Sequence, residues 1–365
     1  MKRFASVITV FLLTIIVGNT IYAQPNDTNK KNIRYFALPV FFKTPELGYS
    51  FGLSGTSSFK TSFYNDSATR TSLIQVLGFF TSRHVNAQAI NASIFLPSEK
   101  NILLFSSTHQ YFPDKFWGIG AKTKPENLSN YIFETFNIFP HFKYKFAKHL
   151  YIGALLDYQH IYKITYTQGS SFDTSNFKGK KPYEVSALGL SVTYDTRSNN
   201  FWPEKGFFIS EQFLHYQKKI ISDFTFDKSI TDIRYFKSLF PHHVLAFQLY
   251  AFQTFGDTPL RDLAALGGAN NLRGIYFGRY RAMKAITLIT EYRFNIYKRL
   301  KGVVFGGVGN IYNKNSDLSI QNNKYNAGLG LRFAFLKSEN LNLRLDYGYS
   351  NKLDNAFYFT IGESF

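Results

Sequence analysis

The residue types that commonly perform catalysis occur in this sequence, but their spacing matches no familiar catalytic or metal site. The eight histidines show no H-E-x-x-H or other metal-binding spacing. Asp157 and His160 lie three residues apart, so on a strand their side chains project from opposite faces, which disfavours a catalytic dyad. No serine stands in a G-x-S-x-G turn, and the absence of cysteine removes thiol nucleophiles and disulfides. We therefore expect no enzymatic activity and no cofactor or metal.

The most unusual chemistry is concentrated in residues 266–281, which combine glycines, apolar residues and three arginines. They lie within the longest expected connection, 256–283. One interpretation is a solvated surface loop whose arginines meet lipopolysaccharide phosphates. The other is a loop folded into the interior, where Gly274 permits a tight bend and Arg273 pairs with a carboxylate. Residue chemistry alone favours neither interpretation.

The whole chain has an unusual composition, with a high positive charge and many aromatic residues. The 365 residues include 42 Lys and Arg against 24 Asp and Glu, giving a net charge of +18, together with an aromatic share of 18%. An ordinary soluble domain rarely combines these features. No nucleic-acid motif accompanies the positive charge, so nucleic acid is not an expected partner. Basic residues that face anionic lipopolysaccharide explain the charge more simply.

The N-terminus carries an export signal. Lys2 and Arg3 precede an apolar run, Val7–Val17, that is too short to span a bilayer as a helix. We interpret residues 1–23 as a secretory signal peptide and 24–33 as a polar leader. No later segment reaches 18 consecutive apolar residues. An exported protein of this kind is either soluble or a closed β-barrel of an outer membrane.

The rest of the sequence favours the barrel. Apolar and polar residues alternate with a period of two, as in Leu341–Ser350, which places one set on each face of a strand. A soluble β-sandwich would alternate too, but many of the sixteen candidate strands exceed ten residues, the length that a bilayer requires. Short connections also alternate with a set that includes long ones, the arrangement of outer-membrane barrels. We expect residues 34–365 to form an all-β, 16-stranded antiparallel transmembrane β-barrel in the outer membrane, with both termini at the short-turn end. The short connections are 65–68, 97–100, 147–150, 241–243, 298–301 and 336–340, and the long ones are 113–129, 168–181 and 256–283.

A family resemblance rests on several motifs. Leu272-Arg273-Gly274-Ile275 resembles the V/L-R-G-F/Y motif of the BamA/TamA family, also called the bacterial surface antigen family. In that family the motif lies between strands eleven and twelve of a sixteen-stranded barrel, which is also its place in our strand count. Further matches are ordered along nearly the whole chain beyond the expected signal peptide. They are Ala37-Leu38-Pro39 with Pro45-Glu46-Leu47-Gly48, Tyr194-Asp195-Thr196-Arg197 with Pro203-Glu204-Lys205-Gly206, Gly328 to Phe333, and Arg344 to Gly348.

Three departures from the family pattern affect what can be transferred. The segment 24–33 is too short for the POTRA modules that receive client proteins in the family. Ser198 replaces an aspartate of the turn motif, and Gly307 stands where the family has an acidic residue. The glycine removes one expected partner of Arg273. Because an unpaired buried arginine is costly, we expect Arg273 to pair instead with Glu291 or Asp346, and the 256–283 loop to fold into the lumen.

Two features concern the strands that close the barrel. Pro39 lacks an N–H and deletes a hydrogen bond in the first strand, and the last strand ends at Phe365, so the seam between them should be weak. In the resembling family this seam is the lateral gate for client strands; Pro39 as a simple strand-entry residue is the alternative. The alternate apolar residues at the C-terminus resemble the assembly signal of outer-membrane barrels. These are Phe357, Phe359, Ile361 and Phe365.

The resemblance implies a protein that assists outer-membrane protein insertion, assembly or translocation, without a cofactor. The implied partners are outer-membrane lipids, lipopolysaccharide, unfolded outer-membrane proteins and a separate periplasmic protein. The alternative is a passive pore or structural barrel, with lumen arginines such as Arg293, Arg332 and Arg344 making an open pore mildly anion-selective. A third possibility, a barrel hydrolase, would be supported only by a lipase or protease activity that a point mutation abolishes.

Overall fold

The computed structural model describes residues 33–61, 69–199, 201–219, 221–336, 341–350 and 355–365. The expected signal peptide, 1–23, lies outside the described residues, as does the polar leader except for Ile33. The short connections expected at 65–68 and 336–340 lie wholly or largely outside them as well.

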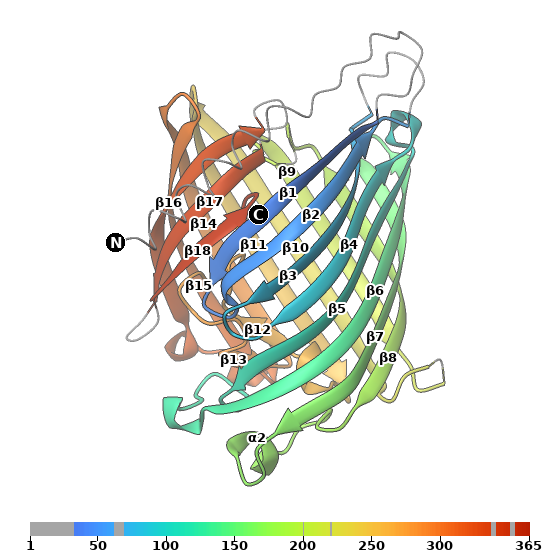
Figure 1. Cartoon of the computed structure of the whole chain (residues 1–365), viewed down its shortest axis with the longest axis vertical. Coiled ribbons are helices and arrows are strands. Elements are labelled where there is room, and N and C mark those ends of the chain that lie inside the picture. The colour runs from blue at the N-terminus through green and yellow to red at the C-terminus, as the bar shows by residue number, and fades with distance from the viewer. Residues whose placement is uncertain (1–32, 62–68, 200, 220, 337–340, 351–354) are drawn as a thin grey trace.

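Sixteen antiparallel strands form a closed barrel, which confirms the predicted fold class and strand count (Figure 1). The first eleven are β1 (Arg34–Thr44), β2 (Gly48–Phe59), β3 (Ser72–Thr81), β4 (Asn86–Phe95), β5 (Asn101–Phe116), β6 (Ser129–Ala147), β7 (Leu150–Tyr166), β8 (Tyr183–Asp195), β9 (Gly206–Tyr216), β10 (Phe226–Phe240) and β11 (His243–Gly256). The last five are β14 (Lys284–Tyr297), β15 (Leu300–Tyr312), β16 (Lys324–Leu336), β17 (Leu341–Ser350) and β18 (Asn355–Ile361). Each barrel strand pairs with its neighbour along the chain, and β1 meets β18 to close the ring.

The remaining elements are short and lie in the connections. The strands β12 (Ala264–Leu266) and β13 (Tyr280–Ala282) pair with each other between β11 and β14, outside the barrel sheet. One helical turn, α2 (Ser171–Thr174), lies with the long connections at the lower end of Figure 1. Five short 3-10 turns complete the described elements: Pro97–Glu99, Pro125–Asn127, Leu260–Asp262, Asn315–Asp317 and Ile320–Asn322.

Alternation of side chains sets the two faces of the wall. In β9, exposed side chains alternate with positions that are buried or partly buried, because successive residues of a strand face opposite sides of the sheet. Ser210, Leu214 and Tyr216 are buried, whereas Phe207, Ile209 and Phe213 are exposed on the outer face. Neighbouring β8 exposes Leu188, Leu190 and Val192 in the same way. An apolar outer face and an inner face that admits polar residues are what a membrane barrel requires.

Helices contribute no membrane span to this part of the chain. Among the described residues, none of the helices is both long enough and apolar enough to cross a bilayer.

The outer face provides a first test of the fold. Leu190 is 72% exposed near the middle of β8, so we expect Leu190→Arg to lower the free energy of unfolding in lipid vesicles by about 2–4 kcal/mol, since a cation facing hydrocarbon is poorly solvated. Leu190→Ala serves as the control and should cost less. Urea titrations of the vesicle-embedded protein measure both. Equal stability of Leu190→Arg and the parent chain would contradict the assignment of this face to lipid.

Candidate functional site

The connection between β11 and β14 packs against the inner face of the barrel. Its apolar residues Leu272 and Ile275 are buried beside the β12–β13 pair. Polar contacts join it to opposite parts of the wall: Tyr276 donates to Asp114 of β5 at 3.2 Å, and Arg273 contacts Asp346 of β17 at 2.7 Å. These contacts match the predicted loop that folds into the interior.

Arg273 is fully buried and contacts both carboxylates that the sequence offered as alternatives. Its Nη2 lies 2.5 Å from Oε1 of Glu291, and its Nη1 lies 2.7 Å from Oδ2 of Asp346. The guanidinium carbon is 3.4 Å from the ring centroid of Phe305, so the arginine also stacks on an aromatic face. A buried charge of this kind is stable only where partners and hydrogen bonds replace water.

The ion pairs extend into a larger cluster. Glu291 also binds Arg293 at 2.8 Å, and Asp346 binds Arg332 at 2.5 Å. We call the set Arg273, Arg293, Arg332, Arg344, Glu291, Asp346 and Glu363 the arginine cluster. With four guanidinium groups and three carboxylates, the cluster draws further acceptors from the main chain. Arg293 donates to the main-chain oxygen of Phe365 at 3.1 Å, and Arg344 donates to the carbonyl of Ala269 at 3.2 Å.

Gly274 allows the loop tip to touch the wall. Its φ is +107°, and a Cβ there would lie 3.0 Å from the carbonyl carbon of Gly348 in β17. Its N–H donates to the hydroxyl of Tyr358 in β18 at 3.0 Å. Both the positive φ and the close approach require glycine.

Gly307 shows how the site accommodates its departure from the family motif. A Cβ at this position would lie 2.7 Å from Oδ1 of Asn326 and 3.1 Å from Leu272. Asn326 donates to the carbonyl of Arg273 at 2.9 Å. Within the described part of the chain, Nε of Arg273 has no hydrogen-bond partner. The space that an acidic side chain would enter is therefore taken by Leu272 and Asn326.

The far side of the loop tip reaches the turn between β1 and β2. The N–H of Phe277 donates to Oε1 of Glu46 at 2.6 Å. Burial raises the pKa of the Glu46 carboxyl above its ordinary value, and the hydrogen bond from Phe277 partly opposes this shift. Gly274 and Phe277, only three residues apart, thus contact β18 and the β1–β2 turn, which lie on opposite sides of the barrel seam.

The seam itself has little backbone pairing. In the described residues the one register pair between β1 and β18 is Lys43 with Phe359, whereas β1 and β2 share eleven pairs. Pro39 pairs with Leu53 of β2. Continuing the seam register by four residues would place Pro39 opposite Glu363, but β18 ends at Ile361.

The chain after β18 turns inward, which corrects one prediction. We expected Phe365 to share a face with Phe357, Phe359 and Ile361; this was wrong for Phe365, and so was its assignment to the seam. Phe357 and Ile361 are 54% and 49% exposed, but Phe365 is buried at 6%. Gly362, with φ of +84°, redirects the chain.

Inside the barrel, the tail 362–365 binds the arginine cluster. Glu363 contacts Arg332 at 2.7 Å, and Ser364 donates to Glu291 at 2.6 Å. The guanidinium of Arg293 lies 5.1 Å from the Phe365 ring. Sequence reasoning missed the roles of Glu363 and Ser364 because it assumed that the last strand was extended to its end; Gly362 was the available signal.

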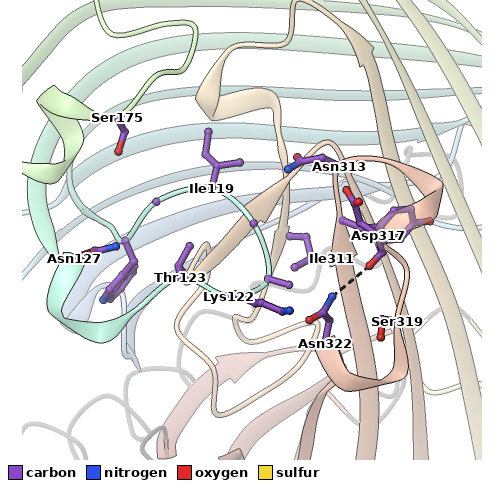
Figure 2. Close-up of a pocket in the computed structure, with 15 residues that line it drawn as sticks. Ile119, Lys122, Thr123, Asn127, Ser175, Ile311, Asn313, Asp317, Ser319 and Asn322 are labelled. Carbon is purple, nitrogen blue, oxygen red and sulfur yellow. Dashed lines mark hydrogen bonds between the residues drawn. The ribbon is translucent and has the colours of Figure 1, made fainter.

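A separate cavity of about 700 Å³ opens among the long connections. Figure 2 shows side chains of one loop, including Ile119, Lys122 and Thr123, facing those of another, including Asn313 and Asp317. The lining mixes amide and hydroxyl groups with apolar side chains, Lys122 and Asp317. Within the described ranges, no group of three or more histidine, aspartate or glutamate side chains is placed to hold a metal.

Comparison with known proteins identifies the family. A family model described as "Omp85 superfamily domain" matches residues 42–365. The chain belongs to the Omp85 superfamily. A search of curated proteins gave no match.

Solved structures show that the chain has the barrel fold of this superfamily. BamA from Haemophilus ducreyi lacking POTRA domains 1–3 is similar over 92% of this chain and 70% of its own, with 12% identity and a TM-score of 0.59. CdiB from Acinetobacter baumannii covers 92% of this chain with 13% identity and a TM-score of 0.60, and CdiB from Escherichia coli covers 93% with 11% and 0.59. The chain spans 60% and 63% of the two CdiB chains. This Omp85 barrel fold implies an outer-membrane location, and the described residues contain no POTRA-like module.

Arg273 provides a test of the site. We expect Arg273→Ala to destabilise the barrel by about 3–5 kcal/mol, because it leaves two buried carboxylates short of a partner. Arg273→Lys should cost less, since it keeps the charge but loses the two-pronged geometry. Urea unfolding in vesicles measures both, with exposed Arg299→Ala as the matched control. If Arg273→Ala unfolds at the same urea concentration as that control, the cluster does not anchor the loop.

Proposed function

We propose that this Omp85 barrel assists the insertion, assembly or translocation of outer-membrane proteins by opening at the β1–β18 seam. The observation that carries the proposal is the single register pair, Lys43 with Phe359, that joins these strands among the described residues. Elsewhere the barrel wall is paired along most of the length of adjacent strands, as in the sixteen pairs between β5 and β6.

A sparsely paired seam is significant because the barrel wall is surrounded by lipid hydrocarbon, which cannot form hydrogen bonds. Backbone N–H and C=O groups that face hydrocarbon without a partner cost several kcal/mol each, so a barrel normally closes completely. An unpaired strand edge is also a template on which another strand can form hydrogen bonds. A client strand that pairs with the edge of β1 would satisfy those groups while it enters the bilayer.

The loop supports this function by bracing the seam from inside. Gly274 binds Tyr358 of β18, and Phe277 binds Glu46 beside β1. These contacts lie beside the one register pair and hold both sides of the seam, so the barrel stays intact while the rest of the β1 edge remains available. The seam can then open without unfolding of the fully paired wall.

The partners follow from the same proposal. The chain would receive unfolded outer-membrane proteins, with lipids and lipopolysaccharide around the barrel. We propose that a separate periplasmic protein delivers the clients. Export would rely on residues 1–23 as a signal peptide, and Phe357, Phe359 and Ile361 would serve in the assembly of this barrel itself.

A locked seam tests the proposal directly, since the chain has no native cysteine. Lys43→Cys with Phe359→Cys places two thiols at register partners, within the separation that a disulfide spans. We expect the oxidised double variant to lose its ability to insert a small eight-stranded client barrel into proteoliposomes, and to regain it on reduction. Heat-modifiable migration of the client on gels reports insertion.

The matched control crosslinks the same strand on its other side. Phe41→Cys with Phe51→Cys joins register partners of β1 and β2, so its oxidation should leave client insertion unchanged. Undiminished insertion by the oxidised seam variant would exclude passage through the seam.

The passive pore is the alternative. Arginines in the barrel interior favour this alternative. However, these arginines are paired with carboxylates, and the loop fills part of the lumen. Planar-bilayer recordings distinguish the two: a nearly closed barrel supports the assembly role, whereas large steady openings that the seam disulfide does not change would support a pore.

A further inference from the structure

Among the described residues, exposed charge at the short-turn end of the barrel is almost entirely positive. Eight exposed cations belong to strand ends or turns there, and the described exposed residues of this end include one acid, Glu204. We call these cations the basic rim. They are Arg34, Lys60, Lys100, Lys148, Lys205, Lys237, Lys298 and Arg299.

The opposite end differs in its balance of charge. Its connections also expose eight cations, but acids stand among them. The cations are Arg83, Lys122, Lys124, Lys178, Lys181, Lys218, Lys219 and Lys314, and the acids are Glu126, Asp223, Asp257 and Asp317. Some charges there neutralise one another, as where Lys178 lies 3.8 Å from Asp257. Among the described residues, the basic rim has one such acid for eight cations, so its exposed charge there is predominantly positive.

Apolar side chains show what surrounds the basic rim. Phe146, Phe240 and Tyr297 are 67%, 52% and 65% exposed at the same strand ends. Lys298 lies 4.8 Å from the ring centroid of Tyr297, and Lys148 follows Phe146 by two residues. Aromatic rings beside cations are typical of the boundary between hydrocarbon and headgroups, where the ring enters the apolar layer and the cation meets phosphate.

We propose that the basic rim binds the phosphate groups of anionic phospholipids in the leaflet next to the short turns. Turns around the barrel contribute its cations, from β4–β5 to β14–β15, which fits an encircling layer of lipid better than one docked acidic protein. The adjoining exposed rings also require an apolar neighbour. Binding would hold this end of the barrel at the headgroup layer whether or not the seam admits clients.

The test compares lipid selectivity with and without the basic rim. The full chain is reconstituted in phosphatidylcholine vesicles that contain spin-labelled phosphatidylglycerol or spin-labelled phosphatidylcholine. Electron paramagnetic resonance measures the share of each label that the barrel immobilises. We expect an association about threefold in favour of phosphatidylglycerol at low salt, declining toward one at 0.5 M NaCl because surface charges are screened.

Two variants with equal loss of charge locate the binding. The rim variant replaces Lys148, Lys237, Lys298 and Arg299 by glutamine, and the control variant replaces Lys124, Lys181, Lys218 and Lys219. Heat-modifiable migration verifies that each is folded. We expect the rim variant to lose most of the preference and the control variant to keep it.

Other outcomes would overturn the proposal. It is wrong if the parent chain shows no preference for phosphatidylglycerol, or if both variants lose it equally. It is also wrong if the rim variant keeps its lipid preference but loses binding to an acidic periplasmic protein, since the basic rim would then be a protein-docking surface.

Discussion

Burial of the Arg273 guanidinium is the constraint on which the interior of this barrel depends. The group has no exposure to water, so Glu291 and Asp346 must both stand beside it, and each carboxylate in turn holds a second arginine. Ion pairs of this kind contribute less to net stability than their number suggests, but removing one member is costly because its partners stay buried. The cluster therefore fixes a position for the loop more than it increases the stability of the wall.

That fixed position connects three parts of the chain far apart in sequence. The loop tip contacts β18 through Gly274 and the β1–β2 turn through Phe277. The tail 362–365, which follows β18, binds the arginine cluster. The last residues thus bind arginines in the lumen and are unavailable to extend the seam. A barrel whose seam is sparsely paired, but braced from inside beside its one register pair, can remain closed while keeping one strand edge accessible.

Likeness to BamA and CdiB barrels at 11–13% identity shows the fold, whereas activity depends on the residues that each chain places on that fold. This chain has its own arrangement of side chains around Gly307 and Arg273. At Gly307, where the resemblance predicts an acidic residue, Leu272 and Asn326 occupy the space that a side chain would enter. Arg273 keeps its place because Glu291, Asp346 and the Phe305 ring surround it.

Sequence alone determined the wall. A period of two, strands of ten residues or more and alternating connection lengths specify a sixteen-stranded barrel, because a bilayer admits few other ways to satisfy the backbone. It also indicated Glu291 and Asp346, since alternation assigns them to the inner face. Tertiary structure decided the rest: how the loop packs against the wall, that both carboxylates bind Arg273, and that Phe365 turns inward. Those outcomes depend on contacts between segments distant in the chain, such as Ser364 with Glu291, and local pattern carries no record of which segments will meet.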